Sequence, residues 1–358
     1  MKKLGILSMA FTFAGCLLGA GYVSGQELWQ YFGSYGKIGL VGLVLSLILA
    51  GLSSWLVIWL SDNAKTGTVD RLIIRFDIPW LRAFVGVLFS LLYFFVAVIM
   101  FAGISSLCYQ MFGINKVVGS AIATVLIMGT VYFGFDGMVK VFDMAVPVLV
   151  VAAIILSIIR LSGTGLSAVD LTPAESNPML GTWYMSAFNY TTLNMFASIG
   201  IIAPLANHLK KKSTGPLGMA LGTFALICIA VLLILALSTD RVSTGTDLPM
   251  LYIANEMGSG YGILYAALLF IAMYGNANAT MVAALNYFAK RMPGGKEKRN
   301  KLIRIVIAGA AAFACSLTGF TKLVATVYPV IGYIGIISLI LIIEHSVHIL
   351  LERRKDVK

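Results

Sequence analysis

Long runs of apolar residues, separated by short polar or glycine-rich stretches, recur along the whole 358-residue chain. Each run has about 18 or more residues, which is enough for an α-helix to cross the hydrocarbon core of a bilayer. Short alternating segments, which would predict a membrane β-barrel, are absent from the pattern. The runs predict ten transmembrane helices at about 5–32, 38–60, 81–112, 116–134, 138–160, 179–207, 216–238, 260–289, 302–319 and 323–350.

Composition agrees with an all-α polytopic membrane protein, because 59% of the residues are hydrophobic and only 11% are charged. A soluble protein carries roughly 25% charged residues. No stretch of the sequence indicates a separate soluble domain, so we predict one transmembrane domain over residues 1–358, with the lipid bilayer as a partner. Residues 1–16 resemble a cleavable lipoprotein signal, but the apolar run continues past Cys16, which favours a first span.

The net charge of +11 reflects topology. With the N-terminus inside, 21 of the 26 lysines and arginines fall on the cytoplasmic side of the predicted spans. This is the distribution that the positive-inside rule describes. It predicts a multi-pass protein of a bacterial inner membrane with both termini cytoplasmic, and it explains the basic charge without a nucleic-acid partner. The five outer residues are Lys37, Lys116, Arg160, Arg241 and Lys322.

Two spans are interrupted at corresponding positions of the two halves. Five spans in each half give the halves opposite orientations, as in transporters built from inverted repeats, here at about 5–160 and 179–350. The first span contains the glycine-rich run 19–25 (GAGYVSG), and the sixth contains the polar run 186–194 (SAFNYTTLN). Paired interrupted spans point to a binding site near the membrane midplane. The alternative for the glycines is close helix packing.

The interrupted spans carry a resemblance to known transporters. Ten spans with a glycine-rich break in the first and a polar break in the sixth resemble the LeuT fold of the amino acid–polyamine–organocation superfamily. More narrowly, the stretch GAGYVSGQELWQYF is similar to the start of YkvI-type bacterial membrane proteins. The resemblance implies a secondary transporter with alternating access and broken helices 1 and 6, and it does not specify a solute.

The candidate solute site lies between the two breaks. Exposed backbone amides in the first span could bind a carboxylate through their partial positive charge, opposite polar and aromatic side chains of the sixth span and a tyrosine of the third. Ordinary packing between spans is the alternative for each aromatic residue. The candidate residues are Gly19, Ala20, Gly21, Tyr22, Val23, Ser24, Gly25, Tyr93, Phe188, Asn189, Tyr190 and Thr191.

Glu27 has two compatible interpretations. Residues 24–27 (SGQE) match a capping box, in which Ser24 would accept from the Glu27 amide and the Glu27 side chain would reach back. An ionisable residue within a span is also a functional candidate, so Glu27 is a candidate gate residue or proton carrier. Similar fold members place a charged gate residue at this depth, and Lys322 or Tyr328 would be its partner here.

The resemblance also implies a coupling cation. Similar sodium-coupled members use carbonyls of the first span and hydroxyls of the eighth. The matching groups, which form a possible sodium site, are the carbonyls of Leu17 and Ala20 and the side chains of Asn276 and Thr280. This set departs from the usual adjacent Ser/Thr pair, so a proton carried by Glu27, or by Asp143 near the cytoplasmic end of the fifth span, is the alternative. We expect no other cofactor.

Enzyme chemistry is not expected, because no HExxH, P-loop or nucleophile–base pattern occurs, and His345 and His348 are expected to be solvated at the cytoplasmic surface. We predict a secondary active transporter of a small polar solute, an amino acid or related zwitterion, coupled to sodium or protons. No charge is clearly fixed at the midplane, which disfavours cationic or dianionic solutes. The alternative is a non-transporting nutrient sensor of the spore germinant-receptor type. The oligomeric state stays open, and a monomer is consistent with the sequence.

Overall fold

The computed structural model describes residues 4–66, 69–76, 78–133, 139–211, 213–291 and 297–356. The first half contains α1 (Ile6–Leu17), α2 (Ala20–Val23), α3 (Gln26–Tyr31), η1 (Gly33–Tyr35), α4 (Lys37–Ala64), α5 (Val69–Ile73), α6 (Pro79–Phe112), α7 (Lys116–Phe133), α8 (Val139–Thr164) and η2 (Leu166–Ala168). The second half contains α9 (Trp183–Ile202), η3 (Ala203–His208), α10 (Thr214–Leu237), α11 (Arg241–Thr244), α12 (Pro249–Met257), α13 (Ser259–Arg291), α14 (Glu297–Ser316) and α15 (Phe320–Asp356).

Each predicted span coincides with a helix or, for the first span, with the run from α1 to α3. Within the described residues, seven helices are long and apolar enough to cross a membrane: α4, α6, α7, α8, α10, α13 and α15. The other three segments fall short because α1 ends after 12 residues, α9 is rich in polar side chains and α14 begins with charged residues. The protein is therefore a polytopic helical membrane protein, and the count of ten spans stays a prediction.

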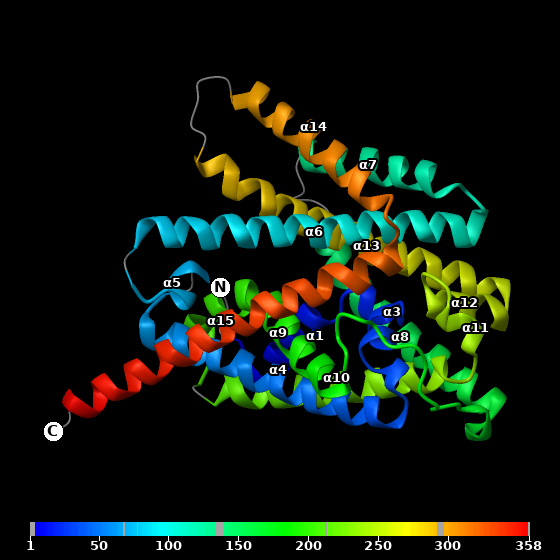
Figure 1. The fold of residues 1–358 in the computed structure, drawn as a ribbon, viewed down its shortest axis with the longest axis horizontal. Coiled ribbons are helices and arrows are strands. Elements are labelled where there is room, and N and C mark those ends of the chain that lie inside the picture. Colours follow the sequence, from blue (N-terminus) through cyan, green and yellow to red (C-terminus); the bar gives the residue numbers. More distant parts are fainter. Residues whose placement is uncertain are drawn as a thin grey trace.

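The helices pack in two groups (Figure 1). Helix α1 packs against α10 and α4 against α9 in the first group, and α6, α7, α13 and α14 contact one another in the second. Helix α15 lies against α9, α4 and α6, and so joins the two groups. The first group therefore contains the first, second, sixth and seventh predicted spans. The second group contains the third, fourth, eighth and ninth. Corresponding spans of the two halves thus share a group, although the inverted repeat itself stays a prediction.

Local sequence signals set the ends of the long helices. Pro79 occupies the first turn of α6, where its missing amide would have no partner. The same helix ends at Gly113, whose φ of 66° is left-handed and therefore favours glycine. We call the end of the bundle that carries α5 the inner end, because the orientation predicted from the sequence places it on the cytoplasmic side, and we call the end that carries α11 and α12 the outer end.

Candidate functional site

The first span is interrupted at the predicted run of residues 19–25, and the interruption consists of two breaks where the sequence predicted one. Helix α1 ends at Leu17, and the four-residue helix α2 follows after Gly19. A second interruption at Ser24 and Gly25 precedes α3. Gly25 has a φ of +84°, and a Cβ there would lie 2.8 Å from Leu237 Cδ1, so both its conformation and its surroundings require glycine. The interrupted backbone is buried among other helices, the condition under which irregular backbone is tolerated in a membrane.

The expected capping box at residues 24–27 is wrong. The Ser24 hydroxyl donates 2.9 Å back to the Gly21 carbonyl and accepts from the Gln26 amide at 3.4 Å. No side chain caps the start of α3, which begins at the left-handed Gly25. Because Ser24 bonds back to the preceding turn, Glu27 is left out of the cap and its side chain has other contacts.

The Glu27 side chain turns into the protein, where it is only 7% exposed. Its Oε1 accepts a 2.7 Å hydrogen bond from the Tyr190 hydroxyl. Its Oε2 lies over Gly21, since a Cβ on that glycine would be 2.7 Å from Oε2 and 3.4 Å from the Tyr328 hydroxyl. Of the two expected partners, Tyr328 is therefore nearby, whereas Lys322 is exposed at the start of α15.

The predicted break in the sixth span is wrong, because α9 is continuous from Trp183 to Ile202. Its polar side chains find acceptors without opening the helix. Thr191 donates to a carbonyl of its own helix and to one on α4, and Thr192 donates 2.6 Å to a carbonyl of α15. Such bonds join helices in a membrane. The polar run therefore binds α9 to its neighbours.

Asn189 uses both ends of its side-chain amide for this purpose. Its Oδ1 accepts from the Tyr31 hydroxyl of α3 at 3.0 Å, and its Nδ2 donates 2.8 Å to the Pro329 carbonyl of α15. A Cβ on Gly332 would lie 2.2 Å from the same Oδ1, so α15 approaches α9 closely here. Asn189 therefore links three helices at the expected solute site.

The aromatic candidates separate into buried and exposed positions. Tyr190 is fully buried, and its ring packs against Tyr31 and Phe32 with centroids 4.9 and 5.0 Å away. Tyr22 is equally buried, and its hydroxyl donates to a carbonyl of α10. Phe188 is 52% exposed, so the structure places it on the exposed face of α9 and away from the site, contrary to expectation. Its side chain points away because Ala187, Asn189 and Tyr190 occupy the buried face.

The backbone amides that were expected to cradle a carboxylate are in use. The amides of Tyr22 and Val23 donate to the Gly19 carbonyl at 3.1 and 3.2 Å, and the Ser24 amide donates to Ala20 at 2.9 Å. The Gly25 amide donates to Tyr22 at 3.1 Å. The segment closes its own short turns, so the expected carboxylate cradle is not formed over residues 22–25.

The candidate sodium ligands are partly brought together. The side-chain amide of Asn276 on α13 lies beside Gly19, 3.7 Å from where its Cβ would be. Thr280 donates back to the Asn276 carbonyl at 2.7 Å. The Leu17 and Ala20 carbonyls each accept one backbone hydrogen bond. A sodium site stays a prediction, and the side chain of Asp143 lies outside the described residues.

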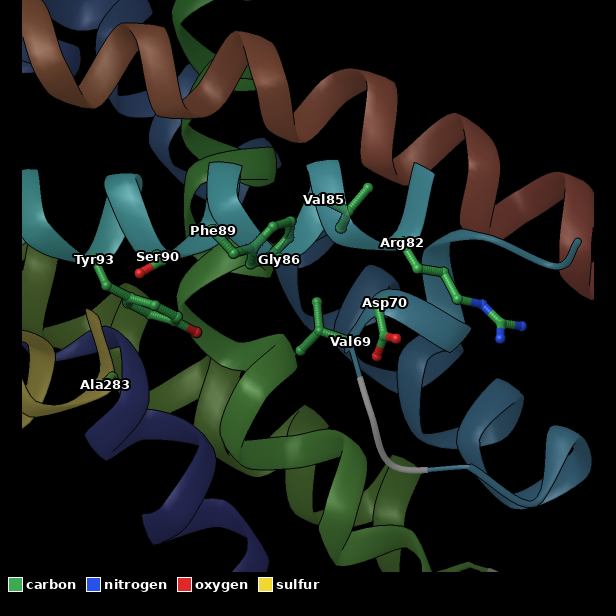
Figure 2. Close-up of a pocket in the computed structure, with 9 residues that line it drawn as sticks. All are labelled: Val69, Asp70, Arg82, Val85, Gly86, Phe89, Ser90, Tyr93 and Ala283. Atoms are coloured by element: carbon green, nitrogen blue, oxygen red, sulfur yellow. The ribbon is translucent and has the colours of Figure 1, made fainter. Parts of the chain in front are cut away.

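A cavity of about 270 Å³ opens at the inner end between α5, α6 and α13 (Figure 2). Figure 2 shows Tyr93 and Ala283 on the side nearest α1 and α13, and Asp70 and Arg82 at the opposite side, where α5 meets the start of α6. Arg82 and Tyr93 are eleven residues apart on α6, which spans about 16 Å of helix. Tyr93 was a candidate from the sequence, whereas no sequence signal indicated the rest of the lining: Val69, Asp70, Arg82, Val85, Gly86, Phe89, Ser90 and Ala283.

Helix α5, which forms part of the cavity wall, is held against α15. His345 is buried, with Nδ1 3.1 Å from the Leu72 carbonyl. Arg75 also pairs with Glu344 at 3.5 Å. The expectation that His345 is solvated is therefore wrong, because α5 folds over it. His348 is part-exposed and lies 2.8 Å from Glu352.

The outer end is tied together around Asp247, in the loop before α12. Its carboxylate accepts from Ser106 of α6 at 2.8 Å, from Lys116 of α7 at 2.5 Å and from Thr321 of α15 at 2.5 Å. Burial opposes ionisation of Asp247, but Lys116 and the two hydroxyls outweigh it and hold its pKa below the ordinary value. The carboxylate is therefore charged at neutral pH.

Further bonds extend this outer closure to the interrupted span. The Met250 amide of α12 donates 2.9 Å to the Ser24 carbonyl, and Gln30 of α3 donates 3.1 Å to the Thr321 carbonyl. Gln110 of α6 accepts from the Leu248 amide at 3.1 Å. The outer end thus connects α3, α6, α12 and α15, whereas the cavity lies at the inner end.

An interrupted first span, two helix groups joined by α15 and a cavity at the inner end define a LeuT-fold membrane protein. Solved structures bear this out: MhsT in complex with L-phenylalanine matches 96% of this chain and 89% of its own with a TM-score of 0.58 at 15% identity. The manganese transporter of Eremococcus coleocola matches 96% of this chain and 78% of its own, with a TM-score of 0.54 at 14% identity.

The sequence relatives confirm the narrower resemblance. The membrane protein YkvI of Bacillus subtilis (strain 168) is 24% identical over 336 residues, which cover 92% of each chain. The chain is thus a homologue of YkvI-type membrane proteins, and its structural neighbours are transporters. No family model matches the chain.

Proposed function

We propose that the protein is a secondary active transporter that moves a small polar solute across a bacterial inner membrane by alternating access. The observation that carries this proposal is the asymmetry of the two ends. Hydrogen bonds around Asp247 tie the outer end over the interrupted span, while a cavity of about 270 Å³ lies at the inner end. This arrangement suits a transporter in an inward-facing state.

The transport cycle would move one helix group against the other. To open the outer end, the bond from the Met250 amide to the Ser24 carbonyl must break, because it connects α12, which packs on α13, to the interrupted first span. The contacts of Asp247 with α6, α7 and α15 hold the loop before α12 in the position that makes this bond. To close the inner end, the cavity between α5, α6 and α13 must collapse. The interrupted first span would act as a hinge between the two movements, since its short helices are separated by glycines.

The solute in this proposal is an amino acid or a related small compound that carries an amino group. The structural neighbours handle different solutes, since MhsT was solved with L-phenylalanine and another neighbour is a manganese transporter. The shared fold therefore does not select the solute. Sodium bound near Asn276 and Gly19, or a proton carried by Glu27, would couple the movement. The contact between Asn276 and Gly19 and the burial of Glu27 support these two arrangements.

Reconstitution into proteoliposomes tests this function. Vesicles with an imposed sodium or proton gradient are expected to accumulate a labelled amino acid or amine in a saturable way, and only when the coupling gradient is present. Stabilisation by a solute without any accumulation would favour the sensor of the spore germinant-receptor type. Flux that does not saturate and ignores both gradients would instead indicate a passive channel.

A further inference from the structure

Glu27 is a buried carboxylate without a positive partner in the described parts of the chain. Its surroundings provide the Tyr190 hydroxyl at 2.7 Å for Oε1, while Oε2 lies over Gly21 near the Tyr328 hydroxyl. No lysine, arginine or histidine that the structure describes forms an ion pair with it. A carboxylate this deep in a membrane protein is costly unless it binds a proton or a positive charge compensates it.

The polarity around Glu27 favours a cation and disfavours an anion. The amides of residues 22–25 already donate within the segment, so they provide no positive pole for a solute carboxylate. The rings of Tyr31 and Phe32 pack against the ring of Tyr190, whose hydroxyl donates to Oε1, and so hold this donor beside the carboxylate. A positive group that approached Oε2 would therefore find a counter-charge that is held in place.

We propose that Glu27 determines specificity by binding the ammonium group of the solute, in a simple amine or in a zwitterion. The inference rests on the proposed function in one respect, which is that the solute site lies at the interrupted first span. It replaces the expectation that no charge is fixed at the midplane, because the capping role that would have occupied Glu27 is absent. A solute with a carboxylate and no amine is not expected to bind.

Binding to the purified full-length protein tests the proposal with probes that share a carbon skeleton. One set is L-phenylalanine, 2-phenylethylamine and 3-phenylpropionate, and a second is L-leucine, 3-methylbutylamine and 4-methylpentanoate. Probes with an ammonium group are expected to raise the melting temperature, and the acids are not. Glu27→Gln is expected to weaken amine binding roughly tenfold or more, because a charged hydrogen bond is lost. Equal binding by the acids, or an unchanged affinity in Glu27→Gln, would overturn the proposal.

A matched control variant guards against a loss of folding. Glu256→Gln makes the same chemical change at an exposed position of α12 and is expected to match the unmodified protein. If Glu27→Gln elutes and melts like Glu256→Gln but has lost the amine response, the effect belongs to binding.

A second readout does not depend on finding a tight probe. Dicyclohexylcarbodiimide reacts with buried carboxyl groups, and mass spectrometry measures its attachment to Glu27. The amine probes are expected to slow this labelling, and the matched acids are not. If no amine probe slows the labelling of Glu27, or if only sodium or acid pH changes its rate, the proposal is overturned and Glu27 is assigned to the coupling ion.

The outcomes separate this proposal from the transport function. Amine binding at Glu27 without accumulation in proteoliposomes would support the ammonium site while transport fails. Gradient-driven accumulation of a solute that lacks an amine, with Glu27→Gln fully active, would support transport while the ammonium site fails.

Discussion

Replacement of Asp247 with asparagine is expected to loosen the outer end. The charged carboxylate accepts from Lys116, Thr321 and Ser106, so three bonds to α7, α15 and α6 weaken together. Hydrogen bonds to charged groups contribute about 1.5–3 kcal/mol each. The Lys116 side chain is 45% exposed, so solvent screening reduces the free energy that its bond to Asp247 contributes. Asparagine still accepts one bond, and we therefore expect a net loss of about 1–3 kcal/mol from the closed outer end.

Hydrogen exchange read by mass spectrometry measures this loss. The Met250 amide is protected by its bond to Ser24, so opening of the outer end exposes it. A loss of about 1–3 kcal/mol corresponds to exchange roughly 5–150 times faster over α12 and α3. Glu256→Gln, an exposed change on α12, is the matched control and is expected to leave exchange unchanged. Unchanged exchange at Met250 in the Asp247→Asn protein would refute the outer closure.

The same bonds predict a dependence on pH. The pKa of Asp247 is held below its ordinary value of about 3.9 by Lys116 and the two hydroxyls, which outweigh burial. A lowered pKa means that the stabilisation is present above the ordinary value and is lost as pH falls through the lowered one. Exchange over α12, corrected for intrinsic rates, is therefore expected to rise below about pH 4, and Asp247→Asn is expected to abolish that rise.

Three further predictions follow from single contacts. Gly25→Ala is expected to lower the melting temperature, because φ is +84° and a Cβ meets Leu237 at 2.8 Å; a destabilisation of at least about 1 kcal/mol is expected from the backbone strain alone, and a wild-type melting temperature would contradict it. Asn189→Ala is expected to cost about 1–3 kcal/mol in chemical unfolding, because its links to α3 and α15 are lost; an unchanged midpoint would show that the links are weak. Ala283→Cys, in a background without native cysteines, is expected to react with a membrane-impermeant thiol reagent from the inner side, because Ala283 lines the cavity and is exposed; labelling from the outer side alone would reverse the orientation.

Much of the fold could be predicted because apolar length and loop charge are direct consequences of the bilayer. Apolar runs located the seven described helices that are long enough to cross a membrane, and the glycines of residues 19–25 located the interruption in the first predicted span. The polar run of the sixth span was ambiguous, because serine, threonine and asparagine can either accompany a break or bond to neighbouring helices. The partners that decided it, on α3, α4 and α15, are distant in sequence.

The site was less predictable, because its contacts also join residues that are distant in sequence. The pattern SGQE allowed a cap, but the left-handed turn at Gly25 and the distant Tyr190 hydroxyl directed Glu27 elsewhere. Phe188 and Tyr190 are two residues apart, and only the packing of α9 decides that one is exposed and the other buried. The outer closure around Asp247 joins four elements, so no local motif could indicate it.

Uptake by proteoliposomes is the most direct test of the central claim, which is that the chain is a coupled transporter of a small amine-bearing solute. Vesicles that contain the protein and carry an imposed sodium or proton gradient are expected to accumulate a labelled amine or amino acid above its external concentration. Collapse of that gradient with an ionophore is expected to release the solute. Equilibration without concentration, whatever the gradient, would contradict the account.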